Sequence, residues 1–327
     1  MMPQPAKCAK YGVAAIAACL PLVAYPQAYP AKPIRLVVTA APGGGDDFQG
    51  RLLAHHLSEA FHQQAFVENR PGGGGIIGRE YVARSTPDGY TLLLGSAAMA
   101  TVPSLHPNAR FNVLRDFTAI SQMSNYPLVL LVHPTVPAHT VKELIALAKK
   151  QPGKLNFGSS GTGGNPHLAA ELFKSMAHID IVHIPYQGSA PAYVDLMSGR
   201  LDMCFGVAAS ALPQVRSGKV RALAVTGARR AAVLPDVPTM SEAALPGYEL
   251  PSWMALFGPA AVTREIVNKL NAEVNRMVAS AGNRERMMTV GVEPEAGTPE
   301  QLHEKLKTAV AKVSRIIHDA GIKPDDR

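Results

Sequence analysis

Three segments rich in glycine and serine carry the groups in this chain that could bind a small anion. Residues 42–47 read Pro-Gly-Gly-Gly-Asp-Asp, a second segment begins at Ser96 and Ala97, and residues 159–165 read Ser-Ser-Gly-Thr-Gly-Gly-Asn. Glycine turns leave backbone N–H groups open, and a helix that starts at such a turn adds unpaired N–H donors and a positive dipole end. Because each segment follows a predicted strand, we interpret the three as parts of one solute site.

Other chemistries need spacings that the chain lacks. Gly43–Gly50 contains neither G-x-G-x-x-G nor the Gly-Lys-Ser/Thr of a phosphate-binding loop. Ser159 and Ser160 do not stand in a G-x-S-x-G elbow. The nearby histidines form no H-E-x-x-H pattern and are interpreted as surface residues: His55, His56 and His62. We therefore predict no catalytic residue, no metal site and no cofactor.

Further features are interpreted as structural. Gly72–Gly75 predicts a flexible turn into a helix, with a ligand role as the alternative. His178 and His183 flank a predicted strand and should serve packing or a local hydrogen bond. Cys204 lies in an apolar run and is predicted to be a buried thiol rather than a nucleophile.

The first 28 residues resemble a secretion signal. Lys7 and Lys10 precede an apolar stretch over residues 13–24, which is too short to span a membrane, and Ala28 supplies a small residue for cleavage. The alternative is lipid attachment at Cys19. We expect a chain exported to the periplasm and cleaved near Ala28.

Composition bounds the class of protein. The 327 residues are 47% hydrophobic and 17% charged, which is typical of a packed globular chain, and about 300 mature residues suggest two domains. The net charge of +7 is not concentrated in clusters interleaved with aromatics. Nucleic-acid binding is therefore not predicted, and we expect a monomer that binds a small molecule.

Strand and helix patterns alternate along the chain. Residues 34–39, for example, predict a strand, and apolar residues recur at helical spacing over residues 48–61. This alternation predicts an α/β fold with largely parallel sheets. Residues 96–116 are expected to be irregular because they contain Pro103 and Pro107. Thr298 and Gln301 predict a capping box at the start of the final helix.

Several ordered motifs resemble one family, the Bug family of periplasmic solute-binding proteins, which are receptor components of tripartite tricarboxylate transporters. The similarity covers essentially the whole mature chain. The motifs include Ala41-Pro-Gly-Gly-Gly, Val67-Glu-Asn-Arg-Pro-Gly, Pro87-Asp-Gly-Tyr-Thr-Leu-Leu, Pro152-Gly-Lys-Leu-Asn-Phe-Gly-Ser-Ser-Gly and Leu234-Pro-Asp-Val-Pro-Thr.

The resemblance implies a type II periplasmic-binding-protein fold, with two α/β lobes around a ligand cleft and two hinge crossings. We place the crossings near Asn125-Tyr126 and near residues 248–252. Residues 29–125 and 249–327 then form lobe 1, and residues 126–248 form lobe 2. The implied function is delivery of a carboxylate, an amino acid or a related metabolite to membrane permease subunits. A solute sensor and a secreted hydrolase remain as alternatives.

The resemblance implies ligand-binding roles for the residues of this chain that match the ligand loops of the family. The matching residues are Pro42, Gly43, Gly44, Gly45, Asp47, Ser96, Ala97, Ser159, Gly161, Thr162, Gly163 and His167. Three further candidates are Phe48, which would close over the ligand or pack into its helix, and Asp202 and Phe205, which lie near another strand end.

Asp46 departs from the family pattern, which usually has threonine at this position. An aspartate replaces a hydroxyl donor with an acceptor that repels a carboxylate. One interpretation is an N-cap for the helix that follows. The other is a preference for an amino acid, a cationic ligand or a neutral ligand.

Overall fold

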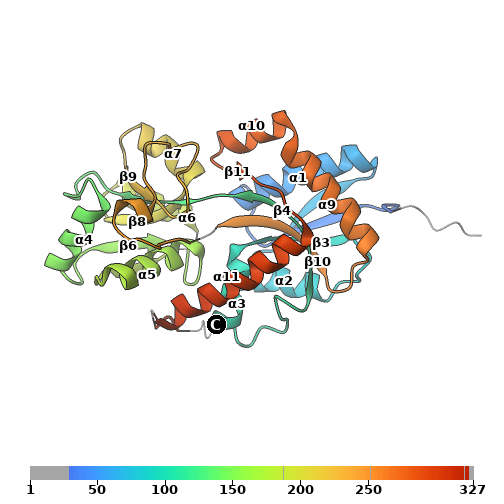
Figure 1. Ribbon diagram of the computed structural model, residues 1–327, viewed down its shortest axis with the longest axis horizontal. Coiled ribbons are helices and arrows are strands. Elements are labelled where there is room, and N and C mark those ends of the chain that lie inside the picture. The colour runs from blue at the N-terminus through green and yellow to red at the C-terminus, as the bar shows by residue number, and fades with distance from the viewer. Residues whose placement is uncertain (1–28, 187, 251, 320, 324–327) are drawn as a thin grey trace, which may run out of the picture.

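The chain folds into two α/β lobes, as predicted (Figure 1). The computed structural model describes residues 29–323 except 187, 251 and 320, so the predicted signal and Cys19 lie outside the described residues. Each lobe is built on one sheet with helices on both faces. In the described part of the chain no helix is both long enough and apolar enough to span a bilayer.

The first lobe contains a six-stranded sheet in the order β11-β4-β10-β3-β1-β2. Its strands are β1 (Ile34–Val38), β2 (Ala65–Asn69), β3 (Thr91–Ser96), β4 (Phe117–Asn125), β10 (Trp253–Pro259) and β11 (Glu293–Pro294). Its helices are α1 (Gly45–Phe61), η1 (Gly73–Gly75), α2 (Ile76–Ala83), η2 (Ala97–Thr101), α3 (Val102–Leu105), α9 (Arg264–Ala279), α10 (Ala281–Thr289) and the first half of α11 (Pro299–Asp319).

The second lobe contains a five-stranded sheet in the order β7-β6-β8-β5-β9. Its strands are β5 (Leu128–Val132), β6 (Asn156–Ser159), β7 (Val182–Pro185), β8 (Met203–Val207) and β9 (Arg221–Val225). Its helices are α4 (Val141–Lys150), α5 (Asn165–Ala177), α6 (Ser189–Met197), α7 (Ala208–Arg216) and α8 (Met240–Ala243).

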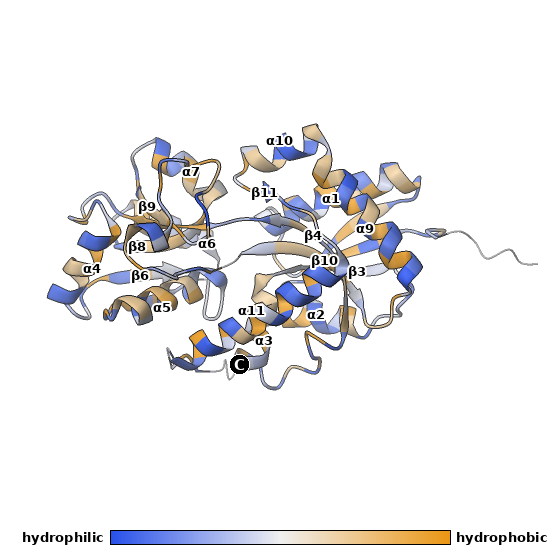
Figure 2. Ribbon diagram, in the orientation of Figure 1, coloured by the Kyte–Doolittle hydropathy of each residue, from blue (hydrophilic) through white to orange (hydrophobic). Residues whose placement is uncertain are grey.

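Alternation along the strands produces separate hydrophobic cores on the two faces of each sheet. On β1, Leu36 and Val38 pack under α1 and α9, whereas Val37 faces the opposite core with α2 and α11. In the second lobe, Leu130 and Leu131 of β5 divide in the same way. A strand with apolar residues on both faces must be covered twice, which explains the layer of helices on each side. The amphipathic pattern is visible along α9 and α11 in Figure 2.

The prediction of largely parallel sheets was wrong, because both sheets are mixed. Strand β10 runs antiparallel to β3 and β4, and β5 runs antiparallel to β8 and β9. β10 was not predicted, because an apolar run of seven residues has no alternation that marks it as a strand.

Residues 97–105 were expected to be irregular but form η2 and α3. Pro103 lies at the start of α3, where its missing N–H costs no hydrogen bond. The capping box is confirmed: Gln301 N donates to Thr298 Oγ1 at 3.2 Å, and Thr298 N donates to Gln301 Oε1 at 2.9 Å.

Two chain crossings connect the sheets. β4 and β5 belong to different sheets and are separated only by Tyr126 and Pro127, and the chain returns between β9 and β10. We propose lobe boundaries at these crossings, with one addition at the C-terminus. Leu302 and Leu306 of α11 pack in a core of the first lobe, whereas Val313 and Ile317 pack in a core of the second. Helix α11 therefore contributes to both lobes.

Leu306 gives a test of this packing. Leu306→Ala should lower the free energy of unfolding by about 2–5 kcal/mol, because the side chain is 2% exposed and its removal leaves a cavity. Lys307→Ala, on the exposed side of the same turn, is the control and should change stability little. Urea unfolding would measure both variants, and equal effects would contradict the assignment of Leu306 to the core.

Candidate solute-binding site

The ligand loops predicted in the first lobe lie at one edge of its sheet. β1 ends before the glycine turn, β3 ends at Ser96 and β4 ends at Asn125. Ser96 and Asn125 pair with Met254 and Trp253 at the start of β10, which places these strand ends beside the second crossing. In open α/β sheets ligands bind outside such strand ends.

Helix α1 begins at this edge without a side-chain cap. Its N-cap is Gly44, and no side-chain hydrogen bond closes its first turn. Gly43 has φ +85°, a conformation that favours glycine. The interpretation of Asp46 as an N-cap was therefore wrong, because Asp46 lies one residue inside the helix and caps nothing. The first N–H groups of α1 remain available to a ligand.

Asp47 holds the glycine turn in place. Its carboxylate accepts hydrogen bonds from Gly43 N at 3.0 Å, Arg51 Nε at 2.8 Å and Asn69 Nδ2 at 3.0 Å. Burial raises the pKa of Asp47, but these hydrogen bonds and the charge of Arg51 outweigh burial and hold the pKa below its ordinary value. Asp47 thus positions the loop, because its oxygens are already occupied by protein donors.

Asp46 faces two residues that the sequence did not indicate. Burial raises the pKa of Asp46 to about 6, and the charge of Arg79 on α2 opposes that rise. Tyr126, at the first crossing, is buried. Burial, and then the charge of Asp46, raise the pKa of Tyr126 far above its ordinary value. The phenol therefore stays protonated and can donate a hydrogen bond.

In the second lobe, α5 also begins at a glycine without a side-chain cap. Its N-cap is Gly164, and the loop before it is held by side chains rather than open to solvent. Gly163 N donates to His167 Nδ1 at 3.0 Å, and Ser159 Oγ lies 2.7 Å from His183 Nε2. The local hydrogen bond predicted for His183 is confirmed. Ser159 is 2% exposed, so its hydroxyl supports the loop.

Two stacked imidazoles form the base of this loop. The rings of His167 and His183 lie 4.0 Å apart, with Phe157 stacked against His183. Burial, His183 and the charge of Lys174 lower the pKa of His167 to about 3. Burial and Lys174 lower the pKa of His183 to about 4. Both rings are uncharged at neutral pH.

Gly163 of the second-lobe loop lies close to α3 of the first lobe. This residue has φ +77°, and a Cβ built on it would lie 2.4 Å from Leu105 Cδ1 on α3 of the first lobe. Gly161 and Thr162 precede it, and Thr162 is exposed. The ligand loop predicted in the second lobe therefore packs at Gly163 against α3 of the first lobe.

Three of the predicted residues lie away from a ligand position, and a fourth remains a candidate. Asp202 lies at the amino end of β8, where its carboxylate accepts a hydrogen bond from Asn156 N at 2.8 Å, so it lies at the wrong end of the sheet for a ligand. Phe205 is 2% exposed and packs edge-on against Phe173, and Ala97 is buried beneath η2. Phe48 is partly exposed and belongs to none of the hydrophobic cores formed by the described residues. It remains a candidate to cover a ligand.

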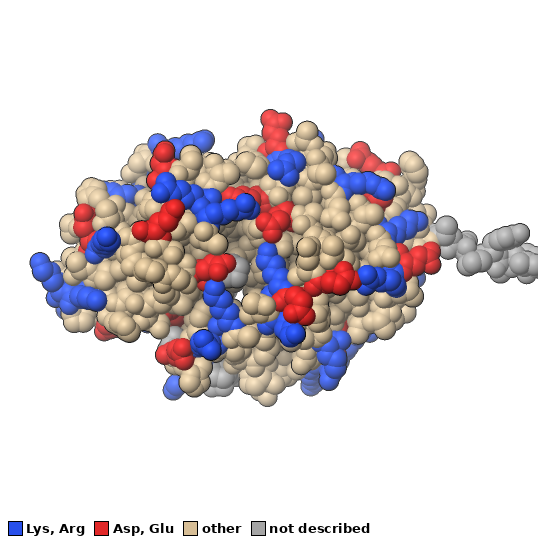
Figure 3. Space-filling model, in the orientation of Figure 1, with Lys and Arg blue, Asp and Glu red and all other residues tan. Residues whose placement is uncertain are grey.

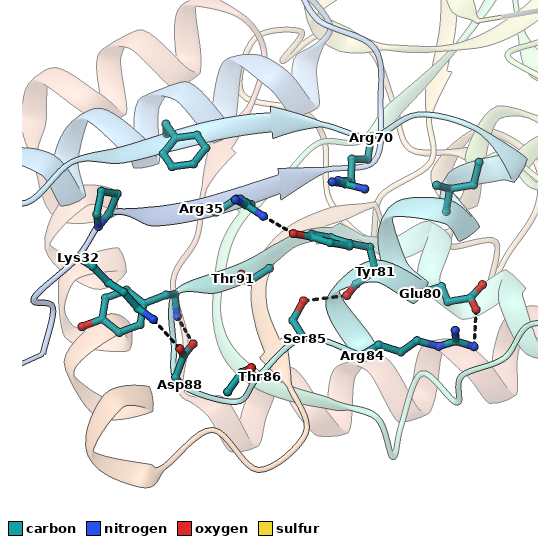
Figure 4. Close-up of a pocket in the computed structure, with 14 residues that line it drawn as sticks. Lys32, Arg35, Arg70, Glu80, Tyr81, Arg84, Ser85, Thr86, Asp88 and Thr91 are labelled. Atoms are coloured by element: carbon teal, nitrogen blue, oxygen red, sulfur yellow. Dashed lines mark hydrogen bonds and ion pairs between the residues drawn. The ribbon is translucent and has the colours of Figure 1, made fainter.

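A hollow of about 1010 Å³ lies elsewhere on the first lobe, between β1, β3 and α2 (Figure 4). Its basic side chains already have partners: Arg84 pairs with Glu80 at 2.6 Å and Lys32 with Asp88 at 3.0 Å. None of the predicted loop residues lines it. We assign it no ligand.

Two absences limit the chemistry of the described residues. No cluster of histidine, cysteine or acidic side chains among them could hold a metal ion. On the face shown in Figure 3, basic and acidic side chains are interspersed rather than gathered in one basic patch.

Cys204 is buried, and burial raises the pKa of its thiol to about 12, so it is unreactive. The fold and these loops define a two-lobed solute-binding protein.

Comparisons with known proteins agree. The family described as "Tripartite tricarboxylate transporter family receptor" matches residues 50–322. Protein BugT of Bordetella pertussis is 35% identical over 297 residues, which cover 90% of this chain and 91% of BugT. A structure of R. palustris Rpa4515 with adipate is 34% identical with a TM-score of 0.83, and covers 91% of this chain and 100% of that one. MatC from Rhodopseudomonas palustris with bound malate is 28% identical with a TM-score of 0.79, and covers 88% and 100%.

The chain belongs to the tripartite tricarboxylate transporter receptor family and is a Bug-type receptor. The family and its structural neighbours are periplasmic solute-binding proteins, so this chain is a receptor rather than an enzyme. The hydrolase alternative is thereby excluded.

Asp47→Ala should destabilise the protein by about 1–3 kcal/mol, because it removes the acceptor of two partly buried hydrogen bonds, from Gly43 N and Asn69 Nδ2. A carboxylate with a lowered pKa stabilises the fold above its unfolded pKa, near 3.8, and that contribution is lost as the pH falls through the folded pKa. Urea unfolding at pH 7 and pH 3 would show a smaller difference between wild type and variant at pH 3. A difference that does not depend on pH would contradict the role of the charge.

The His167–His183 pair predicts a second effect of pH on folding stability, at higher pH than the effect of Asp47. The unfolded chain takes up protons near pH 6.5, whereas the folded pKa values are about 3 and 4, so stability should fall as the pH drops below 6.5. His183→Asn should make the melting temperature less dependent on pH between 6.5 and 4.5. His318→Asn, at an exposed site, is the control, and parallel curves for all three proteins would refute the prediction.

Proposed function

We propose that this chain is an extracytoplasmic receptor that binds a small carboxylate-bearing solute between its lobes and delivers it to a permease of the tripartite tricarboxylate type. The observation that carries the proposal is the pair of uncapped helix starts, one in each lobe, at Gly44 and Gly164. Their free N–H groups and positive dipole ends suit a carboxylate.

The chemistry of two relatives supports this class of ligand. Adipate and malate, which are bound in the structures of Rpa4515 and MatC, are both dicarboxylates. The protonated phenol of Tyr126 supplies a further donor on the first lobe. We propose Gly43, Gly44 and Gly45, with Ser96, as the ligand contacts there, and Gly161, Thr162 and Gly163 as those of the second lobe.

We further propose that residues 1–28 direct export and that the mature chain works in the periplasm as a monomer. The family supports a periplasmic site of action. The permease partner is inferred from membership of the same receptor family.

A thermal-shift screen of the mature chain tests the function. Adipate, malate, succinate, glutarate, aspartate and glutamate are the probes, and a ligand should stabilise the protein by RT ln(1 + [L]/Kd), about 2.7 kcal/mol at one hundred times Kd. Saturable stabilisation by at least one probe is expected. The absence of any stabilisation by the whole set would refute the proposal.

Gly163→Ala tests the interlobe contact. The added Cβ collides with Leu105, so the second-lobe loop cannot pack against α3 as it does here, and affinity for the best probe should fall about tenfold, or ~1.4 kcal/mol. Gly218→Ala is a matched control, because its φ of +70° brings similar backbone strain in open space. Titration calorimetry would measure both, and equal losses would show that strain rather than the contact is responsible.

A further inference from the structure

We propose that Asp46 and Arg79 form a charge pair that makes this site selective for zwitterionic solutes, which carry an ammonium group as well as a carboxylate. The inference rests on the proposed function and specifies its ligand class. Asp46 would contact the ammonium, and Arg79 would be a positioning residue that acts through Asp46.

Asp46 is a carboxylate without a partner. It lies in the first turn of α1, is partly buried, and makes no side-chain hydrogen bond or direct ion pair within the described part of the chain. Its neighbour Asp47, by contrast, accepts three hydrogen bonds. The free oxygens of Asp46 are therefore available to a ligand.

Arg79 provides the opposing charge. Its side chain is 2% exposed, its Nε has no hydrogen-bond partner, and a single donor, Nη1, reaches Gly74 O at 2.9 Å. A Cβ on Gly75 would lie 3.1 Å from its Cζ, so glycine at 75 leaves room for the guanidinium under the loop. The two charges stabilise each other without a direct ion pair. Gly74 and Gly75 of the tetraglycine segment therefore hold Arg79 in place.

A ligand that fills the site removes water from Asp46. A buried charge is costly unless a donor replaces that water. A plain dicarboxylate supplies no donor and adds a like charge, whereas an ammonium group supplies three donors. Arg79 offsets the charge of Asp46, so the ligand carboxylate is not repelled from the N–H groups of α1 and from Tyr126.

Matched probes separate this inference from the function itself. The pairs are succinate and L-aspartate, glutarate and L-glutamate, and adipate and L-2-aminoadipate, each with the same carbon skeleton. Calorimetry on the mature wild type should give at least one pair in which the amino acid binds about tenfold or more tightly. Asp46→Asn should reduce that ratio to within about threefold, and Asp236→Asn, an exposed control with the same change of charge, should retain it.

Two variants test the positioning role of Arg79. Arg79→Lys keeps the charge and should retain the preference, whereas Arg79→Met should reduce it. If Arg79 had only a structural role and both variants melted near the wild-type temperature, both would show the same preference for the amino acid. If Arg79→Met does not fold, the ratio measured for Arg79→Lys and Asp46→Asn still decides the proposal.

Each outcome has one meaning. If dicarboxylates bind as tightly as their amino partners, or if Asp46→Asn leaves the preference unchanged, the inference is overturned while the receptor function stands. If no probe of either kind binds, the receptor function fails and the inference fails with it.

Discussion

The structure depends on two helices, one in each lobe, that start from glycine without a side-chain cap. A side-chain cap would stabilise each helix by about 1 kcal/mol. Gly44 and Gly164 cannot provide that stabilisation, and other residues hold the two turns in place. Asp47 fixes one turn from below, and the His167–His183 stack fixes the other. The polar groups that remain free are those at the surface between the lobes.

Charge differs between the two halves of this surface. In the second lobe, burial keeps the imidazoles of His167 and His183 neutral. The first lobe holds an acid and a base, Asp46 and Arg79, which compensate each other. The sequence alone does not explain Asp46 in a loop proposed to bind an anion, and the buried guanidinium of Arg79 offers an explanation.

Much of the fold could be predicted from the sequence because its signals are local. The alternation of strands and helices, the capping box at Thr298 and the ordered glycine motifs depend on neighbouring residues. The missed features depend on distant ones. β10 is a strand because β3 and β4 flank it, and Arg79 interacts with Asp46 although 33 residues separate them in the sequence. The ligand role predicted for Asp202 is wrong because composition does not reveal that this residue lies at the amino end of β8 rather than at its carboxyl end.

The position of β10 and α11 in the chain has a consequence for biogenesis. β10 lies between β3 and β4, so the first sheet cannot form completely until residue 259 has been synthesised. Helix α11, the last described helix, completes a hydrophobic core in each lobe. A ribosome-bound or partly translocated chain therefore lacks a finished core in either lobe. In the export route proposed above, this late assembly would delay folding until the whole length has been delivered.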